Sequence, residues 1–95
     1  MLFIAYCVDK PDHLQIRLDT RPAHVDFLKE KGDDLKIAGP TTGSDGETPN
    51  GSLLIFEDND LEAAKSWVNG DPYKAAGLFE EVTVKPWKHA VGGGL

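Results

Sequence analysis

Leu2-Phe3-Ile4-Ala5-Tyr6-Cys7-Val8, residues 2–8, is an unbroken apolar run that decides how the rest of the chain must fold. Its length and its aromatic and β-branched content predict a β-strand. A strand in a sheet with one solvated face alternates apolar and polar residues, and this run does not. Leu53-Leu54-Ile55-Phe56 has the same character. The sheet is therefore expected to need cover on both of its faces.

Periodicity and stop signals predict the other elements. A helix is expected over Pro11–Lys31, with Gly32 as a natural stop. Gly39-Pro40 is expected to end the next strand, and the polar segment Thr41–Gly51 is expected to be a loop. After the first helix, the predicted elements are strands at Leu35–Ala38 and Ser52–Glu57, helices at Asp60–Asn69 and Pro72–Ala76, a strand at Phe79–Trp87 and a disordered tail at Gly92–Leu95.

The order strand, helix, strand, strand, helix, strand indicates one α+β domain over residues 1–95. Right-handed connections turn this order into a four-stranded antiparallel sheet with both helices on one face, the ferredoxin-like βαββαβ arrangement. The helices can cover only that face. A second copy of the chain is the simplest cover for the other face, which predicts a homodimer. A buried edge of the last strand or an unrelated partner protein would also satisfy the pattern.

Composition and charge exclude several classes of function. The net charge is −6, and the ten Lys and Arg residues are scattered rather than grouped in a basic stripe. This distribution argues against binding to nucleic acid or to an anionic membrane surface. No apolar run is long enough for a membrane span or a signal peptide, so a cytoplasmic location is expected.

The potential metal ligands and nucleophiles are few. Cys7 is the single cysteine, and its place in the apolar run favours a buried hydrophobe over a nucleophile. His13, His24 and His89 have no ligand spacing, so neither a metal nor a cofactor is expected. Core packing is expected for Tyr6, although it could instead face a pocket. Thr41–Gly51 is interpreted as a plain hairpin loop, with a pocket rim as the alternative.

The first helix carries polar side chains toward the sheet. On a helical wheel, four leucine and valine positions form its core-facing stripe: Leu14, Leu18, Val25 and Leu28. Arg21 falls inside that stripe and His24 on its edge, although Pro22 could kink the helix. Burying these groups without partners would cost several kcal/mol, so each is expected to meet a partner or a wet cavity.

Two later helix starts can be identified from the sequence. Asn59 is the predicted N-cap of the second helix, because Glu62 follows it at capping-box spacing. Asp71 precedes Pro72, which is a common way to begin a short helix. The Asp71 carboxylate could also orient the imidazole of His24 and make it a general base near neutral pH. His24 could alternatively be a satisfied structural histidine.

Together these residues resemble the YciI-like (YCII-related) family over almost the whole chain. The motifs that carry the resemblance are Met1-Leu2-Phe3-Ile4-Ala5-Tyr6, Arg17, Arg21-Pro22-Ala23-His24, Ala38-Gly39-Pro40, Gly70-Asp71-Pro72-Tyr73 with Gly77, and Val82-Thr83-Val84-Lys85-Pro86-Trp87. The resemblance implies a dimeric α+β barrel whose pocket holds a His–Asp pair, here His24 and Asp71. One branch of the family dehydrochlorinates a chlorinated aromatic. The short acidic loop with Asp45 and Glu47 departs from the family pattern.

Three functions fit these observations. The first is a cofactor-independent enzyme in which His24 moves a proton, Asp71 orients it and Arg21 stabilises an anionic oxygen of a small substrate. Tyr73 and Pro40 are expected beside Arg21 in the substrate-binding pocket. The second is a non-catalytic domain that binds a small acidic metabolite with the same groups. The third is a structural dimer in which the His–Asp pair only stabilises the fold.

Overall fold

The apolar run at residues 2–8 forms most of β1 (Leu2–Asp9), an inner strand of the four-stranded antiparallel sheet in the computed structural model, which describes residues 1–95. β3 (Pro49–Glu57) and β4 (Phe79–Pro86) pair with its two edges, and β2 (Leu35–Thr42) lies outside β3. The resulting order, β2-β3-β1-β4, confirms the ferredoxin-like prediction.

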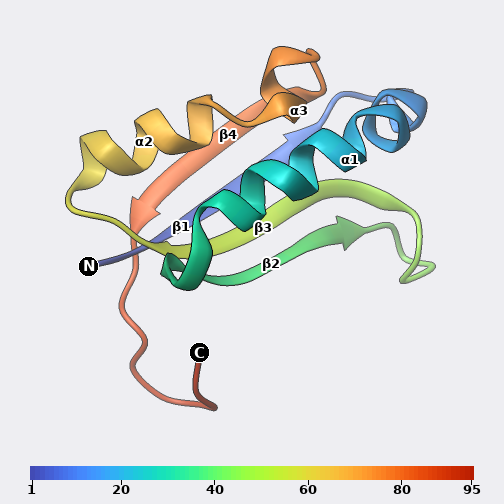
Figure 1. The fold of residues 1–95 in the computed structure, drawn as a ribbon. Coiled ribbons are helices and arrows are strands. Elements are labelled where there is room, and N and C mark those ends of the chain that lie inside the picture. Colours follow the sequence, from blue (N-terminus) through green and yellow to red (C-terminus); the bar gives the residue numbers. More distant parts are fainter.

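The helices cover a single face of this sheet (Figure 1). α1 (Leu14–Glu30) and α2 (Leu61–Asn69) are the two crossover helices, and a 3₁₀ turn, η1 (Gly32–Asp34), follows α1. A short helix, α3 (Pro72–Ala75), leads from α2 toward β4. None of these helices is both long and apolar enough to cross a membrane.

The core lies between the sheet and the helices. Phe3 opposes Phe56 and Ala5 opposes Leu54 across the β1–β3 ladder, and these side chains are fully buried. The α2 residues Ala64 and Val68 complete this cluster. Cys7 lies on the same face and is 1% exposed. Burial, with the nearby charge of Asp71 adding to it, raises the pKa of the Cys7 thiol to about 12, so the group is a buried hydrophobe with no thiolate at neutral pH.

The face of the sheet opposite the helices is also apolar, as predicted. Ile4 opposes Ile55, Tyr6 opposes Leu53, and Ile37 of β2 lies beside Ile55. Tyr6 is 47% exposed here, so the expectation that it packs in the core is wrong. The physical reason is strand alternation, which places Tyr6 on the face opposite Ala5 and Cys7. We call this surface, made of Ile4, Tyr6, Ile37, Leu53 and Ile55, the outer apolar face.

Two strand boundaries differ from the prediction. β2 does not end at Gly39-Pro40 but continues to Thr42, and β3 begins at Pro49, so the hairpin loop shrinks to residues 43–48. Pro40 lacks a backbone N–H, yet β2 is an edge strand, where a missing donor can face solvent. The proline therefore does not interrupt the ladder, in which it opposes Ser52.

The helices differ from the prediction in similar ways. α1 begins at Leu14 rather than Pro11 and passes through Pro22 as one helix. Leu14 and Leu18 are exposed rather than buried, and the two buried residues of α1 are Arg17 and His24. α2 is capped by Asp60 rather than Asn59, because the Asp60 carboxylate accepts a 2.8 Å hydrogen bond from the Ala63 amide.

Candidate functional site

His24 and Asp71 meet across the gap between α1 and the start of α3. His24 Nδ1 lies 2.9 Å from Asp71 Oδ1, and the two residues are 7% and 2% exposed. A carboxylate can only accept, so Nδ1 carries the hydrogen in this pair. The neutral imidazole then keeps its lone pair on Nε2, the atom that a general base needs.

Asp71 has a second role that the sequence also predicted. Its Oδ1 accepts a 2.9 Å hydrogen bond from the Tyr73 amide and so caps α3, whose first residue is Pro72. The Asp71 backbone is extended, with φ −63° and ψ 127°. A following proline disfavours the helical conformation and holds its predecessor in this region. One carboxylate oxygen therefore both starts the helix and orients the imidazole.

The ring of Tyr73 lies between His24 and Arg17. It stacks on the imidazole with ring centroids 3.9 Å apart and an interplanar angle of 18°, and the Arg17 guanidinium lies 4.6 Å from its centroid. Burial raises the pKa of the Tyr73 phenol and the charge of Asp71 adds to this, while the charges of Arg17 and Arg21 oppose it. The Tyr73 hydroxyl therefore keeps its proton at neutral pH.

Arg17 is held in a buried network of its own. Its Nε and Nη2 donate to the two carboxylate oxygens of Asp9 at 2.7 and 3.0 Å, and Nη2 also donates to Ser52 Oγ at 2.9 Å. Burial lowers the pKa of Arg17, but the hydrogen bonds and charge of Asp9 outweigh it, so the net shift is upward. Arg17 is thus a fixed cation whose charge Asp9 balances.

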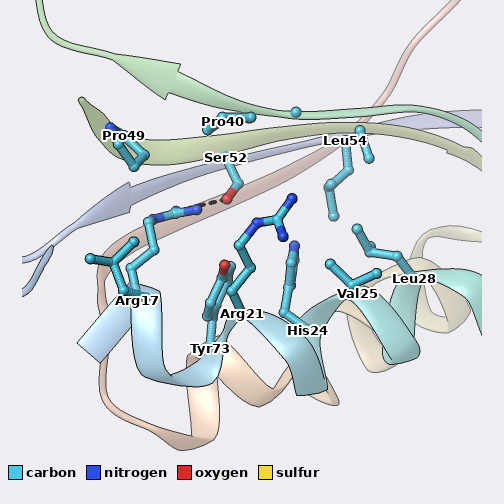
Figure 2. Close-up of a pocket in the computed structure, with 13 residues that line it drawn as sticks. Arg17, Arg21, His24, Val25, Leu28, Pro40, Pro49, Ser52, Leu54 and Tyr73 are labelled. Atoms are coloured by element: carbon cyan, nitrogen blue, oxygen red, sulfur yellow. Dashed lines mark hydrogen bonds between the residues drawn. The ribbon is translucent and has the colours of Figure 1, made fainter. Parts of the chain in front are cut away.

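Arg17, His24 and Tyr73 border a cavity of about 240 Å³ between α1 and strands β2 and β3 (Figure 2). Its polar lining is Arg17, Arg21, His24, Ser52 and Tyr73. The other lining residues are Leu18, Val25, Leu28, Ala38, Gly39, Pro40, Pro49 and Leu54. Figure 2 shows the Arg21 guanidinium extending toward the sheet beside His24, and Arg21 takes part in no ion pair.

The residues singled out from the sequence gather at this one site. His24, Arg21, Tyr73 and Pro40 line the cavity, and Asp71 contacts the imidazole at Nδ1. The hairpin loop at residues 43–48 does not line it, although β2 and β3 contribute residues on either side of that loop. No three His, Cys, Asp or Glu side chains lie close enough together to hold a metal ion.

Sequence reasoning missed part of the site. From the sequence, Ser52 is predicted only to begin a strand, and Arg17 is only one of the positions that carry the family resemblance. Asp9 at the end of an apolar strand and Arg17 in the following helix form a pair of opposite charges that could have suggested an ion pair. Nothing in the sequence spacing indicates that Ser52, 35 positions away from Arg17, joins them.

Among the solved structures that this chain resembles is that of an enzyme with 38% sequence identity. 5-Chloro-2-hydroxyhydroquinone dehydrochlorinase (TftG) from Burkholderia phenoliruptrix AC1100, solved in complex with 2,5-dihydroxybenzoquinone, is 38% identical. It superposes with a TM-score of 0.86, covering 95% of this chain and 96% of that one. An antibiotic biosynthesis monooxygenase with a TM-score of 0.58 covers 96% of this chain and all of its own, but at 16% identity it shares the fold alone.

Two sequence comparisons cover nearly the whole chain. Protein YciI of Escherichia coli O6:H1 is 44% identical over an alignment of 95 positions, which covers 93% of this chain and 97% of that protein. The model of the YCII-related domain matches residues 1–88. On this evidence, the chain belongs to the YCII-related domain family.

Proposed function

We propose that this protein is a small, cofactor-independent enzyme that moves protons on a small anionic or aromatic molecule. The observation that carries the proposal is the His24–Asp71 hydrogen bond at a cavity that also holds Arg21, a guanidinium without a carboxylate partner. A base, a group that orients it and an unpaired cation beside one cavity are the parts that proton abstraction next to a developing oxyanion requires.

In the proposed reaction, His24 Nε2 takes a proton from a hydroxyl or an acidic C–H of the substrate. The electron pair of the broken bond remains on the substrate and is delocalised onto an oxygen near Arg21. The protonated imidazole is stabilised by the Asp71 carboxylate, 2.9 Å from Nδ1. His24 then returns the proton to another substrate atom, which gives an isomerisation, or passes it to water while a leaving group departs with its electron pair, which gives an elimination.

The size and the lining of the cavity favour a small ring as the substrate. Its volume of about 240 Å³ lies below the roughly 300–1,000 Å³ of pockets that take drug-sized ligands. Leu18, Val25 and Leu54 supply apolar walls, and Arg21 supplies the charge for an acidic group. The similarity to a dehydrochlorinase that acts on a hydroxylated, chlorinated ring supports the same substrate class.

Ligand binding tests this proposal directly. We expect 2,5-dihydroxybenzoquinone to raise the melting temperature of the wild-type protein, because a ligand at 100 times its Kd stabilises the folded state by about 2.7 kcal/mol. Arg21→Met should weaken this binding about tenfold by removing a charged donor. Lys29→Met, on an exposed position of the same helix, is the matched control and should bind like the wild type.

Turnover separates an enzyme from a binding domain. The first reaction to assay is chloride release from 5-chloro-2-hydroxyhydroquinone, followed by a panel of hydroxylated rings. Binding without turnover of any of these compounds would favour the non-catalytic metabolite-binding domain. If neither 2,5-dihydroxybenzoquinone nor any of the hydroxylated rings binds, the cavity is not a site for small anionic rings.

We further propose that the protein works as a homodimer joined through the outer apolar face. Tyr6 and Ile37 are 47% and 42% exposed on this face, and the helices on the opposite side cannot reach it. β4 borders the face with Glu81, Thr83 and Lys85, which can form the polar rim of an interface. A second copy of the same sheet provides a self-complementary cover for this patch.

Tyr6→Glu should convert the dimer into a monomer. The substitution places a carboxylate among apolar side chains, and in a two-fold interface each copy contributes the charge. Sedimentation velocity at several protein concentrations measures the change. Glu62→Lys, on the exposed helical side, alters charge without touching the face and should leave the dimer intact. Wild-type protein that sediments as a monomer at high concentration would contradict the proposal.

A further inference from the structure

Two buried hydroxyl groups beside the cavity have hydrogens that no group of the protein accepts. Ser52 is 3% exposed and its Oγ accepts from Arg17, but it donates no hydrogen bond. Tyr73 is 1% exposed, and its phenol oxygen donates none either. The side chain that hydrogen-bonds this phenol oxygen is Arg17, and because a guanidinium can only donate, the phenol hydrogen remains free beside the cavity that Tyr73 lines. Buried donors of this kind need an acceptor.

Arg17 directs one of these hydroxyls. Both carboxylate oxygens of Asp9 hold its guanidinium, so Arg17 is not free to turn toward a ligand. Its Nη2 donates a hydrogen bond to one lone pair of Ser52 Oγ, so the hydroxyl hydrogen must point in another direction. Figure 2 shows Ser52 projecting from β3 toward the side chains of α1 that line the cavity, which leaves the cavity as the place for an acceptor.

The cavity thus offers three hydrogen-bond donors and one acceptor. Ser52, Tyr73 and Arg21 can each donate a hydrogen bond, whereas His24 Nε2 can accept one. Stacking at 3.9 Å with an interplanar angle of 18° holds the Tyr73 and His24 rings nearly parallel, and Figure 2 shows their polar ends directed the same way. A ligand that contacts the three donors and also His24 Nε2 must present an oxygen that only accepts hydrogen bonds. Next to that oxygen it must have an atom that can lose a proton to Nε2.

We propose that Ser52, Tyr73 and Arg21 form a donor cradle that binds one conjugated oxyanion, such as a phenolate or an enolate, beside the proton-accepting nitrogen of His24. This deepens the proposed function, on which it rests for the identity of the cavity as the ligand site. A charged acceptor forms hydrogen bonds about twice as strong as a neutral one, so the cradle selects the ionised form of the ligand. The Asp9–Arg17 pair contributes by positioning Ser52 and touches no ligand.

A pair of probes isolates the charged oxygen. 4-Nitrophenol ionises near neutral pH and its phenolate absorbs visible light, whereas 4-nitroanisole is its uncharged methyl ether. We expect the wild-type protein to bind the phenolate more tightly than the ether and to shift the ionisation of bound 4-nitrophenol to lower pH. Ser52→Ala and Tyr73→Phe should each weaken phenolate binding about tenfold or more, and leave binding of the ether unchanged.

Three controls make the result decisive. Ser66→Ala removes a hydroxyl from an exposed position of α2 and should behave like the wild type. Ether binding shows that the cavity of each variant is intact; if Ser52→Ala does not fold, Tyr73→Phe, which keeps the stacked ring, decides alone. His24→Gln leaves all three donors in place. In that background, Ser52→Ala should therefore still weaken phenolate binding. This test of the cradle does not depend on whether His24 is catalytic.

The results that would overturn the cradle are equally specific. Wild-type protein that binds the two probes equally, or binds neither, contradicts it. So does a folded Ser52→Ala or Tyr73→Phe variant that binds the phenolate as tightly as the wild type. Equal loss of phenolate and ether in both variants would assign the hydroxyls to the shape of the cavity and not to recognition of the charge.

Discussion

Replacing Asp71 with asparagine is expected to lower kcat/KM of the proposed proton transfer by about 10²–10⁴-fold while the protein stays folded. The amide oxygen of asparagine can still accept the hydrogen bonds from His24 Nδ1 and the Tyr73 amide, so the local geometry survives. What disappears is the negative charge that stabilises the imidazole when it has taken up the substrate proton. Initial rates and circular dichroism of the purified variant measure the two effects.

His24→Gln should cause a loss of similar size, because the imidazole and the carboxylate act as one unit. For the same reason, the double variant should be no slower than the worse of the two single variants. Additive losses would show that the two residues act separately. Melting temperatures that collapse in both variants, with no catalytic effect apart from unfolding, would assign the pair to stability alone.

Replacing Arg17 with methionine should destabilise the protein by about 3–5 kcal/mol. The Arg17 and Asp9 side chains are only 5% and 7% exposed, so the substitution leaves the Asp9 carboxylate buried without its cation. Such a loss is a large part of the roughly 5–15 kcal/mol that holds a typical domain together. Urea unfolding followed by circular dichroism gives the free energy of unfolding of the variant and of the wild type.

A second substitution tests the reason for that loss. Asp9→Leu in the Arg17→Met background removes the stranded charge, and most of the lost stability should return. Lys65→Met, at an exposed position of α2, should change the free energy of unfolding by less than about 0.5 kcal/mol. A stability of Arg17→Met close to that of the wild type would show that Asp9 finds another partner or protonates at little cost.

The sequence was sufficient for the order of the elements, because apolar runs and helix-stopping glycines are local signals. Gly32, for example, adopts a positive φ of 63° just after α1, as its place in the sequence predicted. Local signals were misleading where the surroundings decide the outcome. Pro40 suggested the end of a strand, and only the position of β2 at the sheet edge shows why the strand can continue.

The site was less visible than the fold, for a physical reason. The wheel placed Arg21 and His24 toward the sheet, and the structure puts both at the cavity. The Asp9–Arg17–Ser52 network instead joins β1, α1 and β3, and such pairing depends on how distant elements pack. Leu18 was expected in the core but borders the cavity and is half exposed, because a helix packed over a cavity does not bury every residue of its inward stripe.

The Asp71–Pro72 step has a consequence for how the base is prepared for reaction. Proline restricts the backbone of the residue before it, so the chain itself holds Asp71 extended before any substrate arrives. The conformational entropy of orienting His24 is then lost once, during folding, and not at each encounter with a ligand. The His24–Asp71 pair, ordered in this way, needs little reorganisation when charge develops on the imidazole. Fixed dipoles and charges lower a reaction barrier most when they need no such reorganisation.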